Sequence, residues 1–205
     1  MESPPLRLRL LGVGAMASPR YSPAGLLVLA PGGLVMLDGG LGATPDAGSG
    51  RLAAWLVSDP HAELIADIRR RARDLGVVPL VTAYASDDLD ITPLPVEHTS
   101  HDTWGYRLRR SGRTAVWAPE FATFPSWAAR ADLMFADGAG WSRPIRFRGG
   151  VGGHAAVLDT ARAARDAKVG RLVFAHLGRP TLRALDAGAA LPFGEIGIEG
   201  ADYEV

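Results

Sequence analysis

Histidine and aspartate residues follow four short apolar segments of the sequence, at the points where those segments end. They are Asp59 with His61, then His98, Asp137 and His176. If the segments are strands of a layered sheet, their ends meet at one rim, which is where the sites of α/β folds lie. Imidazole and carboxylate groups gathered there are ligands for a transition metal. Taken alone, each aspartate is better explained as a helix or turn cap and each histidine as a hydrogen-bonded core residue. The metal site is predicted because all of these residues lie at strand ends.

The composition narrows the chemistry that such a site can perform. The chain of 205 residues has no cysteine and five histidines, and only one of its 22 basic residues, Lys168, is a lysine. Disulfides, thiolate metal sites and cysteine nucleophiles are therefore excluded, and a metal must be held by His, Asp or Glu. The 22 basic and 22 acidic residues cancel. This balance argues against an extended nucleic acid or a membrane as partner.

The pattern of apolar residues predicts the elements that position these side chains. Alternating Leu and Arg over residues 6–11 predicts a half-buried strand, and the apolar runs at 26–30 and 34–37 predict a hairpin. Further strands are expected at residues 53–57, 77–82, 91–97, 106–110, 114–117, 133–136 and 171–175, and helices at 62–75 and 155–167. His154 is expected to open the second helix, and Gly178 and Pro180 are expected to block continuation of the strand that ends at His176. With no linker or repeat, residues 1–205 are expected to form one domain of α/β layers.

A glycine pattern near the start of the chain resembles a dinucleotide-binding fingerprint. Residues 12–17 fit G-x-G-x-x-[GA] after a predicted strand, with Asp38 further on. That fingerprint works only if a helix begins at the glycines, so that its first amides meet the pyrophosphate. Pro19 and Pro23 follow instead, and then a strand hairpin. We therefore expect a loop here and no dinucleotide site.

The order of these features resembles the metallo-β-lactamase fold superfamily over about residues 6 to 200. The features are the opening strand and glycine loop, the hairpin ending at residues 37–40, the loop at 58–64, and the strand ends at His98, Asp137 and His176. Residues 153–156 before a helix and the strand 172–175 before His176 look most similar to the tRNA 3′-processing ribonuclease (RNase Z) and cyclic phosphodiesterase branch. The resemblance implies a four-layer αββα sandwich with one or two metals in a cleft at its edge.

The signature motif of that superfamily is degenerate in this chain. The superfamily has H-x-H-x-D-H where this sequence has Asp59-Pro60-His61-Ala62-Glu63-Leu64, and only the middle histidine is identical. Carried over by position, the first metal would take Asp59, His61 and His98, with Asp137 bridging. The second would have only Glu63, Asp137 and His176, because Leu64 cannot bind metal. More carboxylate and less imidazole shifts the preference of the site from zinc towards harder ions such as manganese or magnesium, and we expect at most one divalent metal, zinc or manganese, under ordinary conditions.

The resemblance also implies the chemistry and its helpers. A metal-bound water would hydrolyse a small phosphodiester or ester, with Glu63 orienting or deprotonating the water and His154 donating a proton to the leaving group. His101 is either a substitute ligand or, as we favour, a loop residue. An arginine-rich loop that could hold an anionic substrate lies between Asp137 and His154, with Arg143, Arg146 and Arg148.

Two alternatives to this hydrolase remain open. The first is a degenerate member with weak or no metal that serves as a binding or regulatory module, because Asp59 and Leu64 replace histidines. The second is oxidative chemistry at a facial triad of Asp59, His61 and His98. The sequence shows no signal peptide or membrane-spanning run, so a cytoplasmic protein is expected. Its expected partner is a small anionic substrate, and a homodimer is possible.

Overall fold

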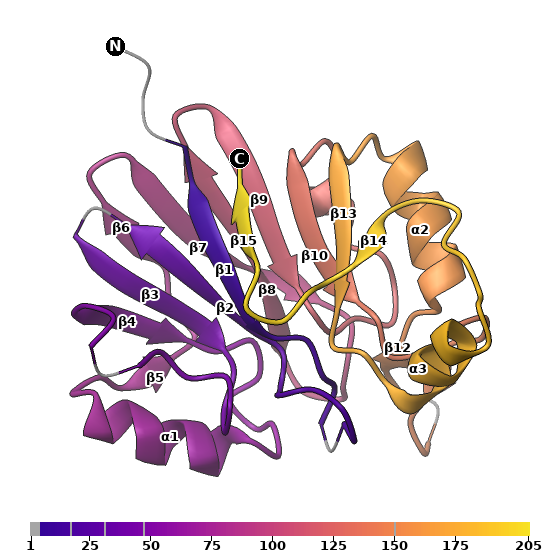
Figure 1. Cartoon of the computed structure of the whole chain (residues 1–205), viewed down its shortest axis with the longest axis horizontal. Helices are drawn as coiled ribbons and strands as arrows, with labels where there is room; N and C mark the ends of the chain where they lie inside the picture. The colour runs from indigo at the N-terminus through magenta and orange to yellow at the C-terminus, as the bar shows by residue number, and fades with distance from the viewer. Residues whose placement is uncertain (1–4, 17, 31, 47, 150) are drawn as a thin grey trace.

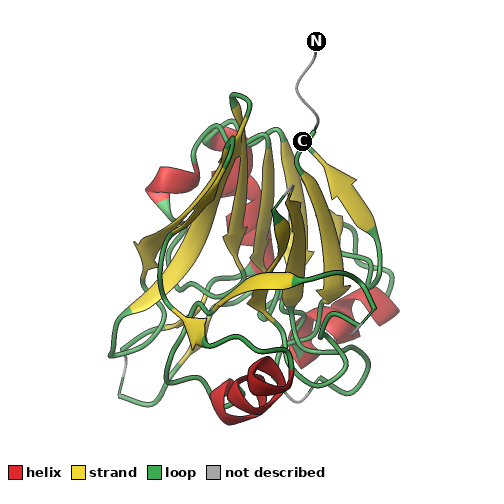
Figure 2. Cartoon of the chain, turned by 90° about the vertical axis from the view of Figure 1, so that its left-hand side faces the viewer, coloured by secondary structure: helices red, strands yellow, loops and turns green. Residues whose placement is uncertain are grey.

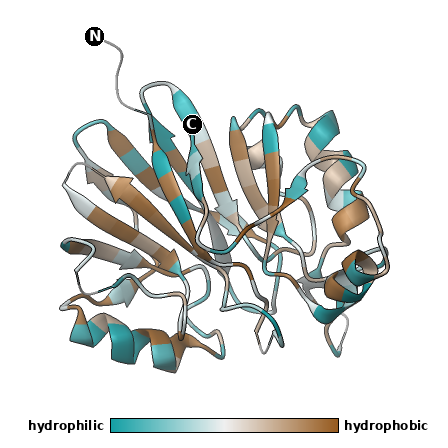
Figure 3. Cartoon of the chain, viewed as in Figure 1, coloured by the Kyte–Doolittle hydropathy of each residue, from teal (hydrophilic) through white to brown (hydrophobic). Residues whose placement is uncertain are grey.

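Two β-sheets stacked face to face, with helices on their outer sides, make up the protein (Figures 1 and 2). The computed structural model describes residues 5–16, 18–30, 32–46, 48–149 and 151–205. Apolar residues are concentrated in the strands, as Figure 3 shows for β2 and β3. The αββα sandwich implied by the resemblance is confirmed.

The first sheet has six strands in the order β15-β1-β2-β3-β4-β5. Their bounds are β1 (Arg7–Gly12), β2 (Gly25–Ala30), β3 (Gly33–Asp38), β4 (Leu52–Leu56), β5 (Pro79–Leu80) and β15 (Asp202–Glu204). The alternation in β1 turns Leu8 and Leu10 into the core and leaves Arg7 and Arg9 exposed, as predicted. The strand predicted at 77–82 is shorter, because only two of its residues pair with β4.

The second sheet has seven strands in the order β14-β13-β10-β9-β8-β7-β6. Their bounds are β6 (Tyr84–Ser86), β7 (Leu89–Val96), β8 (Thr103–Arg110), β9 (Arg113–Ala118), β10 (Leu133–Asp137), β13 (Arg171–Ala175) and β14 (Glu195–Ile196). Strands β9, β10 and β13 run parallel to one another. Parallel neighbours end at the same edge, so the residues that follow these three strands gather there.

Within the described residues, three α-helices cover the sheets: α1 (Ile65–Asp74), α2 (Val157–Asp166) and α3 (Arg179–Asp186). A short 3₁₀ helix, η1 (Ser126–Ala128), lies between β9 and β10. Helix α1 buries Ile68 and Ala72 against a small core that contains Met36 and Trp55 of the first sheet. The main core lies between the two sheets and extends to α2. No helix within the described residues is long and apolar enough to cross a membrane.

The strand before His176 ends at Ala175, as expected, but the helix that follows it was not predicted, and the expectation for His154 was wrong. Helix α3 begins directly after Gly178 with Pro180 in its first turn. Proline is tolerated in the first turn because the amides there have no acceptor within the helix. His154 does not open α2 but lies in a two-residue strand, β12 (Gly153–His154), which pairs with β11 (Ile145–Arg146). The glycine pattern at residues 12–16 opens no helix, as expected; its residue 17 lies outside the described ranges.

Candidate active site

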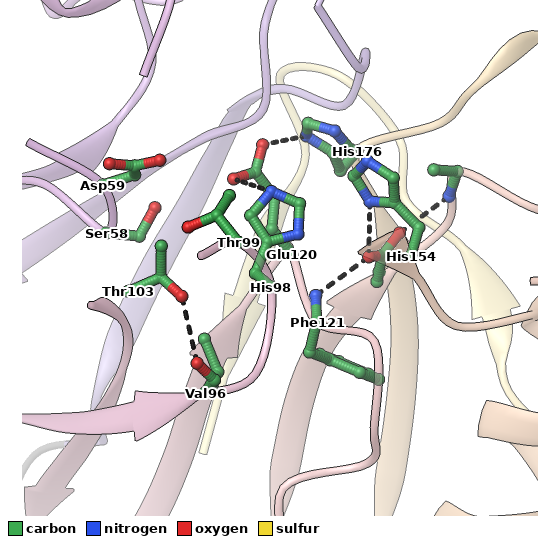
Figure 4. Close-up of polar contacts among 12 residues, drawn as sticks. Ser58, Asp59, Val96, His98, Thr99, Thr103, Glu120, Phe121, His154 and His176 are labelled. Atoms are coloured by element: carbon green, nitrogen blue, oxygen red, sulfur yellow. Dashed lines mark hydrogen bonds and ion pairs between the residues drawn. The ribbon is translucent and has the colours of Figure 1, made fainter. Parts of the chain in front are cut away.

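The ends of strands from the second sheet bring the side chains of His98, Asp137 and His176 together around Glu120 (His98, Glu120 and His176 are labelled in Figure 4). Asp137 ends β10, His176 follows β13, and His98 lies two residues beyond β7. All three side chains are buried. His176 also has a positive φ of 54°. A non-glycine residue in this conformation costs about 1–3 kcal/mol, and such strain clusters at functional sites.

Glu120 lies at the centre of this group, between two histidines. Its Oε2 is 3.3 Å from Nε2 of His98 and its Oε1 is 3.3 Å from Nδ1 of His176. Nδ1 of His98 is 2.9 Å from the carbonyl oxygen of Gly153 and must donate to it, because a carbonyl only accepts. Nε2 of neutral His98 would then present a lone pair to the Glu120 carboxylate. A proton or a cation between them is required to make this contact favourable.

Sequence reasoning missed Glu120. It follows the apolar strand β9 after a single proline, which is the same strand-end placement that singled out Asp137 and His176. A search that included glutamate among the strand-end residues would have found it.

His154 and Asp137 form a hydrogen-bonded pair beside this group. Nδ1 of His154 is 2.8 Å from Oδ2 of Asp137. The same carboxylate accepts hydrogen bonds from the amides of Phe121 (3.0 Å) and Ala139 (2.9 Å). Burial by itself would lower the pKa of His154, but the charge of Asp137 and the hydrogen bond to it outweigh burial, so the pKa is raised. Asp137 therefore orients His154 and favours its protonated form, and the proposed role of Asp137 as a bridging ligand stays a prediction.

The pKa of His176 is shifted in the opposite direction from that of His154. Complete burial lowers the pKa of His176, although the charges of Glu120 and Asp137 act in the opposite direction. Its ring stacks on that of His154 with centroids 5.2 Å apart. His176 is therefore the neutral imidazole of the pair at physiological pH.

The degenerate motif forms a second cluster at the other side of the site. Both oxygens of Asp59 are close to Nε2 of His101, at 2.9 and 3.0 Å, and the carboxylate also accepts the amide of His61 at 2.8 Å. His61 itself is exposed. Glu63 is exposed as well and lines a small cavity of about 60 Å³ that Glu120 also lines. His101, which the sequence left as a loop residue, is thus the partner of Asp59.

Leu64 lines the same small cavity as Glu63 and Glu120 but has no atom that could bind a metal there. It is half-buried and packs against the small core under α1. The position where the superfamily motif has its last histidine has therefore become part of the hydrophobic packing of this chain.

The donor atoms do not assemble into a metal site as they are arranged. Among the described residues, no group of three or more His, Asp or Glu side chains could hold a metal ion. The nitrogens of His98 and His176 face opposite oxygens of Glu120 and do not point at a common position. Asp59, shared by the predicted first-metal set and the facial triad, is engaged by His101. The structure therefore does not fit the two-metal centre implied by the resemblance.

A comparison with known protein families identifies the family of the chain. Residues 32–177 match the family described as "Beta-lactamase superfamily domain". The chain belongs to this superfamily. The resemblance found in the sequence is thereby confirmed, and the match spans every predicted site residue from Asp59 to His176.

Solved structures of the superfamily share the fold. A diphosphatase of the PhnP family is 19% identical with a TM-score of 0.72, and the alignment covers 98% of each chain. Zinc-bound PqqB from Methylobacterium extorquens is 14% identical with a TM-score of 0.70, covering 97% of this chain and 100% of that one. The short form of human tRNase Z is 11% identical with a TM-score of 0.66, covering 96% and 98%. No curated protein sequence matches the chain.

Proposed function

We propose that the protein is a hydrolase of a small anionic ester, a phosphodiester or a carboxylic ester. The observation that carries the proposal is the buried Asp137–His154 pair, which lies beside Glu120 and the two other imidazoles. A charged, oriented imidazole next to a carboxylate is the arrangement that general acid–base catalysis needs. Membership of the superfamily and the likeness to a diphosphatase support the same class of reaction.

Each residue has a role that follows from its contacts. Asp137 occupies Nδ1 of His154, so Nε2 is the nitrogen that donates a proton to the leaving-group oxygen. Glu120 orients the attacking water and accepts its proton. The role of base that the resemblance assigns to Glu63 stays a prediction, and the position of the half-buried Glu120 between two imidazoles makes it the stronger candidate.

The metal is part of the proposal. His98, His176 and Glu120 supply the donor types of a single zinc or manganese site, and we expect at most one divalent ion for each chain. Because these three donors do not converge on a common position among the described residues, the roles of His154 and Glu120 do not depend on an ion.

The experiment measures metal content and turnover together. The protein is purified without chelator, analysed for metals, and assayed with bis(p-nitrophenyl) phosphate and p-nitrophenyl acetate, with EDTA, zinc or manganese. His154→Gln is expected to lower kcat by about 10² to 10⁴, the usual worth of a general acid. Glu204→Gln, an exposed carboxylate on β15, is the control and should leave kcat unchanged. Equal turnover by His154→Gln and the wild type would refute the assignment.

One observation favours a second candidate, a binding module without catalysis. Leu64 packs against a hydrophobic core and offers no ligand, and the carboxylate of Asp59 is engaged by His101. The same assay separates the two candidates. A chain that binds bis(p-nitrophenyl) phosphate in calorimetry but turns over neither ester under any metal condition is the module.

A further inference from the structure

The glycine loop, residues 12–16, binds the backbone of the residue that follows His176. The carbonyl oxygen of Val13 accepts the amide of Leu177 at 2.6 Å, and the amide of Ala15 donates to the carbonyl oxygen of Leu177 at 3.2 Å. Val13 and Leu177 are both buried. Both backbone groups of Leu177 are therefore held by the loop whose sequence resembles a dinucleotide fingerprint.

The glycine loop is in turn fixed to its surroundings. The amide of Gly14 donates to the carbonyl oxygen of Ser22 at 2.7 Å, so the backbone of Gly14 lies between the segment that follows the loop and Leu177. Beyond the loop, Arg20 forms two hydrogen bonds of 3.0 and 2.8 Å with Asp186, the last residue of α3. The position of the loop is therefore set by neighbours on both sides.

Only glycine fits at position 14 of this loop. A Cβ on Gly14 would lie 2.6 Å from the carbonyl oxygen of Tyr21 and 2.9 Å from that of Ser22. Both are backbone atoms, so turning a side chain cannot relieve the overlap and the loop would have to shift. Because the residues on either side of Gly14 hold Leu177, such a shift moves the backbone next to His176.

His176 requires this kind of support. Its φ of 54° is strained, and a strained backbone persists only where the surrounding structure determines it. Its Nδ1 is 3.3 Å from Oε1 of Glu120, and its ring stacks on that of His154 with centroids 5.2 Å apart. Since the backbone of a residue sets the direction of its side chain, a change at His176 displaces the ring from both partners.

We propose that the glycine loop positions His176 and that Gly14 is the positioning residue. The loop holds Leu177 so that His176 keeps its left-handed backbone and presents its imidazole to Glu120 and His154. The inference rests on the proposed function, because displacement of His176 lowers turnover only if Glu120 and His154 have the roles assigned to them.

The test compares Gly14→Ala with an alanine substitution at the far end of β13. Gly170 precedes β13, whereas His176 follows it, and a Cβ on Gly170 would lie 2.8 Å from the carbonyl oxygen of Asp132. Neither Gly14 nor Gly170 has a left-handed φ. Both variants should therefore lower the urea midpoint through a backbone overlap. Only Gly14→Ala should also lower kcat, by about tenfold to a hundredfold, with KM changed by less than about threefold.

A second measurement does not require turnover. The chain has five histidines, so ¹⁵N–¹H NMR can resolve the imidazole nitrogens, and His176→Gln identifies the signals of His176. In EDTA, these signals should shift in Gly14→Ala and stay in place in Gly170→Ala. The kcat loss of Gly14→Ala should also disappear in the His176→Gln background, whereas its stability loss should remain.

A milder pair of variants decides the question if Gly14→Ala does not fold. Arg20→Gln removes the ion pair that ties the segment after the glycine loop to α3. Arg9→Gln removes an equally exposed pair outside the loop, with hydrogen bonds of 2.7 and 2.9 Å to Asp202. The imidazole signals of His176 should shift in Arg20→Gln and stay in place in Arg9→Gln.

The outcomes separate the positioning role from the proposed function. Equal changes of the His176 signals within both pairs of variants would overturn the positioning role, and so would a kcat loss of Gly14→Ala that persists without His176. The hydrolase would stand in either case. No turnover of the two p-nitrophenyl esters by the wild type would overturn the proposed function, and the NMR comparison would still decide the positioning role.

Discussion

Asp38 links the two sheets next to the candidate site, and its carboxyl group should make the stability of the protein depend on pH. It ends β3 with a positive φ of 51°. Its Oδ1 accepts hydrogen bonds from the amide and hydroxyl of Ser58, at 2.6 and 3.0 Å, and its Oδ2 accepts from Nε1 of Trp117 at 2.7 Å. Burial raises the pKa of Asp38 from 3.8 to about 6, because the hydrogen bonds do not fully offset the loss of water.

The direction of the effect follows from the two pKa values. Below about pH 4 the carboxyl is protonated in both the folded and the unfolded chain and contributes nothing to their difference. Between pH 4 and 6 the folded chain retains the proton that the unfolded chain loses, so the free energy of unfolding falls as the pH rises. A shift of about two pKa units corresponds to about 3 kcal/mol in full, of which about 2 kcal/mol develops between pH 4.5 and 7.5.

The assay is urea unfolding of the wild type and of Asp38→Asn at several pH values in EDTA. The amide side chain of the variant does not titrate, so subtracting the two curves cancels the other ionisable groups. We expect the wild type to lose about 2 kcal/mol relative to Asp38→Asn from pH 4.5 to 7.5. Asp90→Asn, an exposed carboxylate on β7, is the charge-matched control and should parallel the wild type. Parallel curves for wild type and Asp38→Asn would refute the reasoning.

Two further predictions each use a matched pair of substitutions. The hydroxyl of Thr160 is buried with no hydrogen-bond partner within the described residues, whereas that of Thr181 donates to a backbone carbonyl at 3.3 Å. Thr160→Val should therefore raise the melting temperature by about 2–4 °C and Thr181→Val should lower it, as calorimetry can check. Gly149 and Gly152 both have positive φ, but only at Gly152 would a Cβ overlap the carbonyl oxygen of His98. Gly149→Ala should cost about 1 kcal/mol in urea unfolding, and Gly152→Ala should cost more and also reduce turnover; equal costs would contradict the packing argument.

The strands and several site residues could be predicted from local sequence patterns. The alternation of Leu and Arg in β1 depends only on the two faces of a strand, and the continuous apolar run in β10 depends on burial from both sides. His98 and His176 were found because each follows such a segment. These features are local, so a window of a few residues contains the information that determines them.

Other features could not be predicted because they depend on contacts between distant segments. Which carboxylate faces which imidazole is decided by the order of β9, β10 and β13 in the sheet, and this order places Glu120 between His98 and His176. The pairing of Asp59 with His101 likewise joins residues 42 positions apart.

The sequence by itself determined the strand pattern, the absence of cysteine chemistry and the loss of two motif histidines. Only the tertiary structure decided that Asp137 holds His154, that Leu64 packs against the small core under α1, and that Glu120 lies between His98 and His176. The physical reason is that burial and hydrogen bonding are properties of neighbours in space. Which residues become neighbours is decided when the two sheets pack around a shared core, and the residues of one strand alone do not contain that information.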